Sequence, residues 1–266
     1  STGVMPHLKI YDASSLAYRQ GRTRRGSYAA YLDIHHPDII QFLEMRKPTG
    51  DQNVRTLNLH HGINITDEFM TIIEKAMKDP DFDDSFQLKN PASGEVVETV
   101  SAKYLWQKIL DLRMQTGEPY LVFIDTANKA LSKHQRELGL KIKMSNLCSE
   151  ILLPTGPDHL ENDRTAVCCL SSLNAETWDE WHDDPLIIED VLRFLDNVLQ
   201  AFIDEAPKGM ERATYSATRE RSVGLGLMGF HSFLQLKSLS FEITPNFPFS
   251  ALLLSIKQYR CPIVKL

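Results

Sequence analysis

A helical pattern that stops at a glycine and leads directly into a buried-type strand limits the possible folds of this chain more than any other feature. Residues 101–116, "SAKYLWQKILDLRMQT", place Leu105, Ile109 and Leu112 on one face, and Gly117 offers a C-terminal stop. The segment that follows, "PYLVFID" (119–125), is a short apolar run typical of a strand inside a sheet. Strands separated by helices of this length predict an α/β fold with a parallel or mixed sheet.

Two further helices and one polar segment extend this pattern. Thr66 can cap a helix with acidic residues in its first turn, and Asp184 with Pro185 can begin another helix over residues 185–204. The apolar stripes expected to face the core are Phe69, Met70, Ile73 and Met77 in the first helix and Ile187, Val191, Leu195, Val198 and Phe202 in the second. Residues 79–100 are polar and predict a surface loop or a hairpin.

Charge and cysteine content narrow the classes of function. The chain has 266 residues and a net charge of −6, without the basic surplus that marks a nucleic-acid-binding protein. We expect no membrane partner, because no apolar run reaches the roughly 20 residues that span a bilayer and no signal peptide opens the chain. The 4 cysteines form no C-x-x-C pair and favour a reducing, cytoplasmic setting. Because the chain starts at Ser1, we expect it to be a fragment.

Residues 145–151, "SNLCSEI", set an amide, a thiol and a carboxylate two residues apart. In a strand, alternation would put Asn146, Cys148 and Glu150 on one side and a largely apolar side opposite. Burying a carboxylate without a partner is costly, so the polar side is expected to line a cavity.

A second thiol-bearing strand is predicted over residues 164–174, "RTAVCCLSSLN". Alternation places Cys168 and Cys169 on opposite faces, so one of them at most can share a cavity with Cys148. Two thiols and a carboxylate without an adjacent histidine base fit acyl transfer poorly. This set of side chains favours redox or radical chemistry.

The two thiol-bearing segments and their flanks resemble the large (α) subunit of the ribonucleotide reductases. In chain order the resemblance is carried by "TGVMPHLKIYDA", "RQGRTRRGSYAAYLDIHHPDIIQFLEMRK", "SNLCSEILLPTG", "AVCCLSSLN" and "RERSVGLGLMGFHSFLQ". It implies that residues 1–242 are an incomplete part of a ten-stranded α/β barrel with two five-stranded halves, and that "SNLCSEI" lies near a finger-like loop inside the barrel. Residues 243–266 are interpreted as a divergent tail, and Cys261 within it is assigned no role.

The resemblance also implies a radical reduction of ribonucleoside diphosphates to deoxyribonucleotides. Cys148 would become a thiyl radical and abstract the 3′-hydrogen of the ribose, and Glu150 would take the proton of the 3′-hydroxyl. Asn146 would hold the ribose hydroxyls in register. Cys168 would be one member of the redox pair that ends as a disulfide, with its partner upstream of this chain. Cys169 departs from the usual sequence of the family and is expected to pack in the core.

Residues 19–25, "RQGRTRR", are the most basic short run of the chain. Taken alone, such a run is usually a solvated surface loop. In the resembled family this position links the allosteric specificity site to the active site, and Gln20 and Arg25 match residues that respond to the effector base and touch the substrate base. Guanidinium groups suit this task because they bind phosphates and base edges. Gly21-Arg22 stands where the family usually has two glycines.

The resemblance implies partners rather than bound cofactors. The radical would come from a metal-containing small (β) subunit, and thioredoxin or glutaredoxin would supply the reducing equivalents. The allosteric effectors would be deoxynucleoside triphosphates (dNTPs) and ATP, bound where two α subunits meet in a homodimer. Two alternatives stay open: an adenosylcobalamin-dependent ribonucleotide reductase, and an inactive or split-gene fragment that needs a complementing chain for its missing segments.

A glycine-rich motif near the C-terminal end suggests a dinucleotide site. "GLGLMG" (224–229) matches G-x-G-x-x-G, but the residues before it are too charged and too few for a buried strand. No acidic residue stands about 20 positions further on to hold a ribose. A Rossmann-type dehydrogenase is therefore rejected, and the glycines are expected to permit close helix–strand packing.

Two pairs of adjacent histidines suggest a metal. The side chains of His35-His36 and of His60-His61 would point apart on strands, and no carboxylate–histidine pair has helical ligand spacing. We therefore predict no metal site. A separate aromatic and acidic run, "WDEWHDD" (178–184), is interpreted as a solvated loop that ends in a helix cap.

Overall fold

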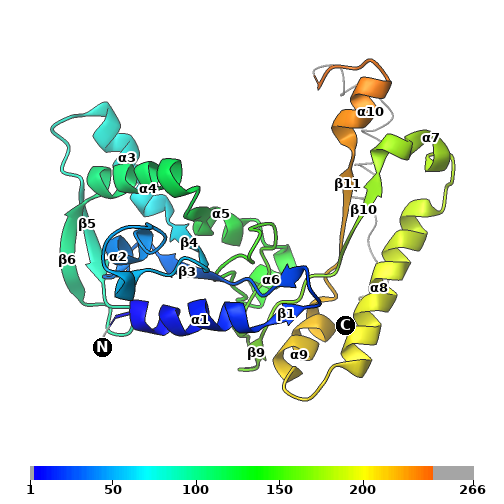
Figure 1. Ribbon diagram of the computed structural model, residues 1–266, viewed down its shortest axis with the longest axis horizontal. Coiled ribbons are helices and arrows are strands. Elements are labelled where there is room, and N and C mark those ends of the chain that lie inside the picture. The colour runs from blue at the N-terminus through cyan, green and yellow to red at the C-terminus, as the bar shows by residue number, and fades with distance from the viewer. Residues whose placement is uncertain (1–2, 242–266) are drawn as a thin grey trace. The chain divides into compact units, whose positions relative to one another are not determined.

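The computed structural model describes residues 3–241 and divides into two compact units, the first ending at Glu161 and the second beginning at Asn162. Each unit contains helices and parallel strands, as the α/β prediction requires (Figure 1). The assignment of residues 1–242 to one barrel stays a prediction. The tail over residues 243–266, with Cys261, lies outside the described residues.

The first unit begins with a helix and a small hairpin and then alternates strands with helices. Its elements are α1 (Met5–Ala17), β1 (Arg19–Gln20), β2 (Arg24–Arg25), β3 (Ala29–Asp33), α2 (Ile39–Leu43), η1 (Gln52–Val54), β4 (His60–Ile65), α3 (Asp67–Lys78), β5 (Ser85–Lys89), β6 (Val96–Ser101), α4 (Ala102–Thr116), β7 (Tyr120–Phe123), α5 (Ile124–Lys129), α6 (Lys133–Glu137) and β8 (Gly156–Pro157).

Strands β3, β4 and β7 form a parallel sheet with β4 at its centre. The pairing sets Tyr31 beside Gly62 and Gly62 beside Tyr120, so these three residues form one row across the sheet. Five of the six residues of β4 are buried, as expected for a central strand covered on both faces. The strand predicted in "PYLVFID" is confirmed as β7, although Phe123 at its end is exposed.

Helices α3 and α4 begin and end where their sequence signals predict. The Thr66 side chain accepts a hydrogen bond from the backbone of Phe69, and Gly117 ends α4 with a left-handed φ of 79°. The predicted face of α4 is confirmed, because Leu105, Ile109 and Leu112 are buried. The prediction for one residue of the α3 stripe was wrong: Met77 is 77% exposed, and its neighbour Ala76 is buried instead.

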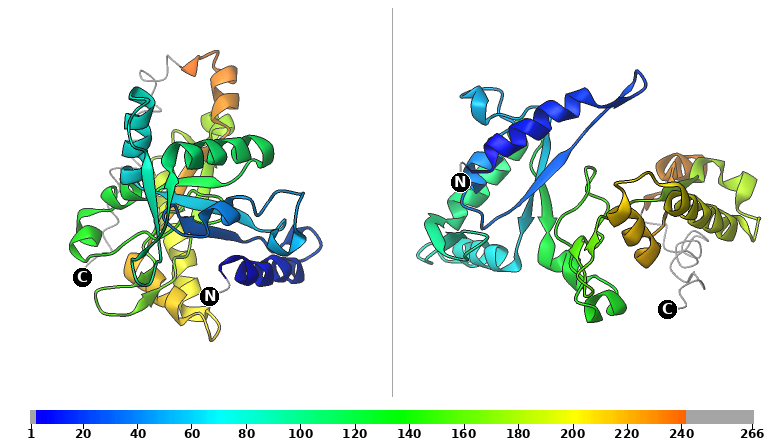
Figure 2. Two further views of the ribbon diagram at one scale, coloured as in Figure 1. Left: turned by 90° about the vertical axis from the view of Figure 1, so that its left-hand side faces the viewer. Right: turned by 90° about the horizontal axis from the view of Figure 1, so that it is seen from below.

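The core of the first unit lies between its sheet and the helices. Figures 1 and 2 show α3 and α4 on one side of the sheet and α1 on the other, with α1 leading into the β1–β2 hairpin. The polar segment 79–100 forms the antiparallel β5–β6 hairpin, which confirms one of the two predicted forms. The largest buried side chains of this core include Phe42, Phe69, Phe86, Met45, Ile34 and Ile63.

The second unit is built around two parallel strands and a pair of helices. Its elements are β9 (Asp163–Arg164), β10 (Leu170–Asn174), η2 (Ala175–Thr177), α7 (Trp178–Trp181), α8 (Ile187–Glu205), α9 (Glu211–Glu220), β11 (Gly224–Met228) and α10 (Phe230–Leu236). Strand β10 pairs in parallel with β11, and α8 and α9 pack together in the connection between them.

Three predictions in the second unit need correction. Helix α8 begins at Ile187 with Leu186 as its N-cap, so Asp184 is not the cap; it accepts a hydrogen bond from the Leu186 backbone in the turn before the helix. Val198 is 44% exposed, and Leu199 is the buried neighbour of Leu195. The run "WDEWHDD" is not a solvated loop. Its first four residues are helix α7, and Trp178 is buried in a cluster with other aromatic side chains. Burying a large aromatic ring removes much apolar surface from water and so stabilises the fold, which a solvated loop would not do.

The segment "GLGLMG" is a strand rather than the turn of a dinucleotide site. Residues 224–228 form β11, so Gly224 and Gly226 lie within the strand itself, and Gly229 follows it as the N-cap of α10. This placement agrees with the rejection of a dehydrogenase. The predicted packing against a helix does not apply to Gly224, where a Cβ would lie 2.6 Å from the Leu170 side chain of strand β10, but it does apply to Gly229, where a Cβ would lie 3.1 Å from the backbone nitrogen of Glu176 in η2.

No helix within residues 3–241 combines the length and the hydrophobicity that crossing a bilayer requires.

Candidate functional site

The segment that carries Cys148 is a turn, not the strand that alternation predicted. The backbone N–H of Ser149 donates to the carbonyl of Asn146 at 3.2 Å, which closes a four-residue turn with Cys148 in its third position. Ser149 has a left-handed φ of 68°, a conformation that an extended strand cannot contain. The alternation argument for Asn146, Cys148 and Glu150 therefore does not apply, although the three residues remain neighbours.

Asn146 holds this turn with its side chain. Its Oδ1 accepts a hydrogen bond from the backbone N–H of Ile151 at 3.0 Å, and the Ser145 hydroxyl donates to the carbonyl of Ile151 at 2.9 Å. These bonds close the chain on either side of the thiol. Cys148 and Glu150 are exposed, whereas Asn146 is half-buried. The thiol and the carboxylate are thus reachable from solvent, and the amide belongs to their support.

Two tyrosines of the sheet lie close to the turn, and the sequence interpretation missed both. The Tyr31 hydroxyl donates to the Asn146 carbonyl at 2.7 Å. Burial raises the pKa of Tyr31, and hydrogen bonds with Ser149 and Ser145 oppose the rise. Burial also raises the pKa of Tyr120, with added contributions from the nearby Glu118 and Cys148. Both phenols are therefore protonated near neutral pH. Of the two, only Tyr120 lay in a predicted strand, "PYLVFID", and nothing in the sequence placed Tyr31 near Cys148.

The adjacent histidines of β4 converge on one carboxylate, contrary to the prediction that they point apart. Nδ1 of His60 contacts Glu118 Oε1, and both Nδ1 and the backbone N–H of His61 lie 3.0 Å from Glu118 Oε2. Arg46 lies 3.6 Å from the same oxygen. The convergence arises because Glu118 stands just before β7, beside the first residues of β4.

This cluster favours a charged Glu118. Burial acts to raise the pKa of Glu118, but the hydrogen bonds from His61 and His60 and the charge of Arg46 outweigh it and lower the pKa to about 2. Burial lowers the pKa of His61, whose side chain is fully buried. The carboxylate is therefore ionised and accepts hydrogen bonds from imidazole groups. Within the described residues no group of three or more possible ligands is arranged to hold a metal ion.

The paired cysteines of the second unit precede β10 instead of lying within one strand from 164 to 174. Cys168 is exposed, and Cys169 is 8% exposed among Leu195, Leu199 and Ala217. The Cys169 thiol donates to the Leu195 carbonyl at 3.3 Å, and burial raises its pKa. The predicted opposite orientation of the two thiols and the packing role of Cys169 are confirmed. A cavity shared by Cys168 and Cys148 stays a prediction.

The basic segment 19–25 is a short antiparallel hairpin. Arg19 pairs with Arg25, and Gln20 pairs with Arg24. The turn between the two strands begins at Gly21, whose φ of 64° suits a glycine. Arg24 and Arg25 are exposed. Gln20 and Arg25 thus lie in an ordered hairpin. The effector role predicted for these two residues stays a prediction.

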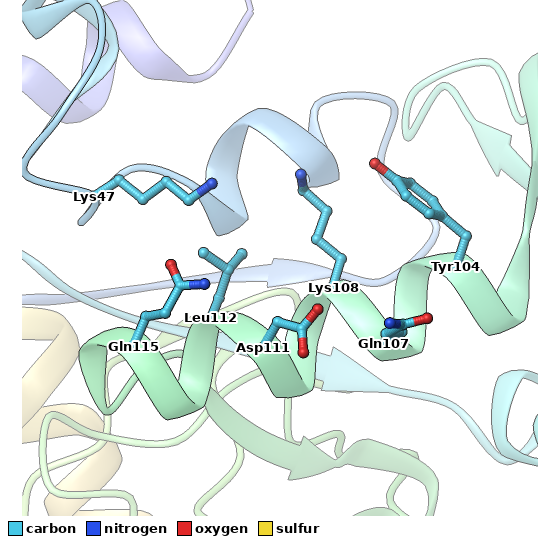
Figure 3. Close-up of a pocket in the computed structure, with 7 residues that line it drawn as sticks. All are labelled: Lys47, Tyr104, Gln107, Lys108, Asp111, Leu112 and Gln115. Carbon is cyan, nitrogen blue, oxygen red and sulfur yellow. The ribbon is translucent and has the colours of Figure 1, made fainter.

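A separate hollow of about 250 Å³ lies along α4 and does not include the turn of Cys148. It is lined by Lys47, Tyr104, Gln107, Lys108, Asp111, Leu112 and Gln115 (Figure 3). Nζ of Lys108 lies 2.5 Å and Nζ of Lys47 lies 3.4 Å from the carboxylate of Glu44, and the hydrogen bond from Lys108 is the main cause that lowers the pKa of Glu44. The Lys108–Glu44 ion pair joins the end of α2 to α4, so Lys108 serves the packing of the two helices, whereas the Lys47–Glu44 pair is local.

The first unit combines parallel β–α units with an exposed thiol turn that hydrogen-bonds to its sheet, and the sheet is not closed into a barrel. Fold and site together define an α/β protein with a candidate site around an exposed cysteine. The family model "Ribonucleotide reductase, barrel domain" matches residues 1–259. The chain belongs to this family, and the resemblance found in the sequence is confirmed.

Relatives and solved structures agree with this assignment. A Frog virus 3 relative is 51% identical over 245 residues, which are 91% of this chain and 41% of that protein. The ribonucleoside-diphosphate reductase large subunit of Invertebrate iridescent virus 3 is 43% identical over 294 aligned residues, 93% of this chain and 46% of that protein. The class Id ribonucleotide reductase α subunit of Actinobacillus ureae has a TM-score of 0.65 and 32% identity, covering 82% of this chain and 36% of that structure. The chain therefore spans less than half the length of these proteins.

Proposed function

We propose that the protein containing this chain is the large subunit of a ribonucleotide reductase and converts ribonucleoside diphosphates to deoxyribonucleotides, the precursors of DNA. The observation that carries the proposal is the exposed Cys148 in a turn hydrogen-bonded to the parallel sheet, in a chain of this family. The names of the relatives, which describe ribonucleoside-diphosphate reductases, support the substrate class. The names of these relatives give no support to the adenosylcobalamin-dependent alternative.

In the proposed reaction Cys148, as a thiyl radical, abstracts the 3′-hydrogen of the ribose. Glu150 takes the proton of the 3′-hydroxyl, and the 2′-hydroxyl leaves as water. Because Oδ1 of Asn146 accepts the Ile151 N–H, its amide nitrogen is the group that would donate to the ribose hydroxyls. Cys168 and a second cysteine outside this chain supply two electrons and two protons and become a disulfide. Glu150 returns its proton to the 3′-oxygen, and the hydrogen taken from C3′ returns to that carbon and regenerates the Cys148 radical.

The partners follow from the same assignment. The radical would reach Cys148 from a metal-containing small subunit, and thioredoxin or glutaredoxin would reduce the disulfide in the cytoplasm. A homodimer of α subunits is supported by α1, which exposes a set of large apolar side chains at one end: Ile10, Tyr11, Leu16 and the following Tyr18. The β1–β2 hairpin with Gln20 and Arg25 directly follows this helix, so a dNTP or ATP effector at the dimer contact would lie close to the hairpin.

The test is reduction of CDP by the protein that contains this chain, mixed with its small subunit, a dithiol reductant and ATP. We expect dCDP to form only when both subunits are present. The 266-residue chain alone should be inactive, because the family's reaction needs segments that this chain does not carry. Turnover that requires adenosylcobalamin and no small subunit would instead support the alternative class, and turnover by the isolated chain would contradict the proposed need for a complementing segment.

Cys168 is expected to be the oxidised thiol after one turnover without external reductant. It is exposed, whereas Cys169 is buried and hydrogen-bonded in the core of the second unit. Alkylation of the remaining thiols followed by peptide mapping should find Cys168 in a disulfide and Cys169 free. A disulfide at Cys169 would reverse the assignment of the two residues.

A further inference from the structure

The hydroxyl of Tyr31 is a direct link between the sheet and the turn that carries Cys148. Tyr31 lies in β3, 115 residues before Asn146, and donates to the Asn146 carbonyl at 2.7 Å. Ser145 and Ser149 on either side of the thiol also influence this phenol, since hydrogen bonding with them opposes the rise of the Tyr31 pKa that burial causes. The carbonyl of Asn146, at the start of the turn, is therefore tied directly to one side chain of the sheet.

Gly62 provides the space in which the Tyr31 ring lies. The two residues are partners in the β3–β4 pairing. A Cβ at Gly62 would lie 2.3 Å from Cε1 and 2.6 Å from Cδ1 of Tyr31, well below a possible contact. The backbone of Gly62 does not have a positive φ, so the position requires a small residue for its volume and not for its conformation. The ring of Tyr31 thus crosses the central strand because that strand has no side chain at this point.

The carbonyl of Asn146 uses both of its acceptor sites within this arrangement. One accepts the N–H of Ser149, which closes the turn, and the other accepts the hydroxyl of Tyr31. Together they fix the peptide group that lies two residues before Cys148. We propose that Tyr31 is a positioning residue for Cys148: it sets the height and orientation of the thiol above the sheet through the Asn146 carbonyl.

This role rests on the reductase function proposed above. Hydrogen transfer between sulfur and a ribose carbon requires a close approach, and a displacement of about 1 Å can lower a rate by about a hundredfold. Tyr31 itself does not have to touch the substrate. Its loss should therefore lower kcat while leaving the KM for the nucleotide nearly unchanged.

The variant Tyr31→Phe, made in the protein that contains this chain and assayed with its small subunit, tests the proposal. We expect kcat for CDP reduction to fall about tenfold, with KM within about twofold of the wild type. Hydrogen exchange read by mass spectrometry should rise about threefold to tenfold in residues 145–151, because a lost hydrogen bond changes local opening by that factor. Exchange in α4, residues 102–116, should not change. Tyr28→Phe, which removes a hydroxyl from the same chain segment, is the matched control and should behave as the wild type.

Gly62→Ala provides an independent route to the same displacement. Its methyl group would occupy the space of the Tyr31 ring, so exchange in residues 145–151 should rise although Tyr31 is intact. Because both changes break one hydrogen bond, the double variant should show no further increase in exchange over Tyr31→Phe. Additive effects would overturn the proposal.

The outcomes separate this inference from the proposed function. If the wild-type protein reduces CDP and Tyr31→Phe matches it in kcat and in exchange at 145–151, the positioning role is wrong while the function stands. Equal increases of exchange in 145–151 and in 102–116 would make Tyr31 a general scaffold residue and would also overturn the role. If the wild type is inactive but exchange at 145–151 rises selectively, the structural link holds and the proposed function fails.

Discussion

Replacing Cys148 with alanine is expected to abolish ribonucleotide reduction by the complete protein. The change removes the sulfur that is proposed to abstract the 3′-hydrogen, and no other described cysteine lies in the first unit, since Cys168 and Cys169 belong to the second. Loss of the group that carries the chemical step lowers rates on the order of 10⁴-fold or more. Formation of dCDP by Cys148→Ala, measured with the small subunit and reductant in excess, should lie below the detection limit.

Two controls make this result specific. Cys169→Ala removes a thiol from the core and should cost about 1 kcal/mol of stability while activity stays close to that of the wild type. Cys148→Ala should still bind CDP, since the thiol is proposed to react with the ribose and not to hold it. Turnover of Cys148→Ala above one percent of the wild-type rate would contradict the assigned chemistry.

Replacing Glu118 with glutamine is expected to lower the free energy of unfolding of the first unit by about 3 kcal/mol at pH 7. The pKa of Glu118 falls from 4.5 to about 2 on folding, and a difference of this size corresponds to about 3 kcal/mol. Its hydrogen-bonding neighbours in the fold are His60 and His61, and a neutral amide cannot balance the charge of Arg46.

The same shift fixes the pH range of the effect. A carboxylate with a lowered pKa stabilises the fold fully above its unfolded pKa and loses the contribution as the pH falls from about 5 to about 2. Hydrogen exchange of the β4 amides in increasing urea, compared between wild type and Glu118→Gln, should show a difference at pH 7 that shrinks at pH 3. Glu98→Gln, on the exposed surface of β6, should show no difference at either pH. A Glu118→Gln effect that is equal at both pH values would refute the electrostatic explanation.

The elements with local signals could be predicted from the sequence. Helix α3 begins at the expected cap, Thr66, and α4 ends at the expected stop, Gly117, because capping depends on residues within one turn. The side chains that face the core were predicted less well at the margins of each stripe. Met77 and Val198 are apolar and have the right period, but the packing partners that decide burial come from distant parts of the chain.

The local geometry of the candidate site could not be predicted from the sequence. "SNLCSEI" alternates polar and apolar residues as a strand does, yet it turns at Ser149 under hydrogen bonds that include one from Tyr31, 115 residues away. In the same way His60 and His61 meet at Glu118, which is 57 residues beyond His61. Neither partner could be inferred from spacing. The family resemblance identified the family because it rests on ordered motifs rather than on local conformation, and the roles it assigns to Cys148, Glu150, Asn146 and Cys168 stay predictions.

The two outer strands of the β3–β4–β7 sheet each pair on one side only within the described residues. Their outward rows of amide and carbonyl groups are templates for another strand, and exposed edges of this kind promote self-association. The isolated segment is therefore expected to aggregate through these strand edges. Co-expression with the strands that continue the barrel would satisfy these edges during folding.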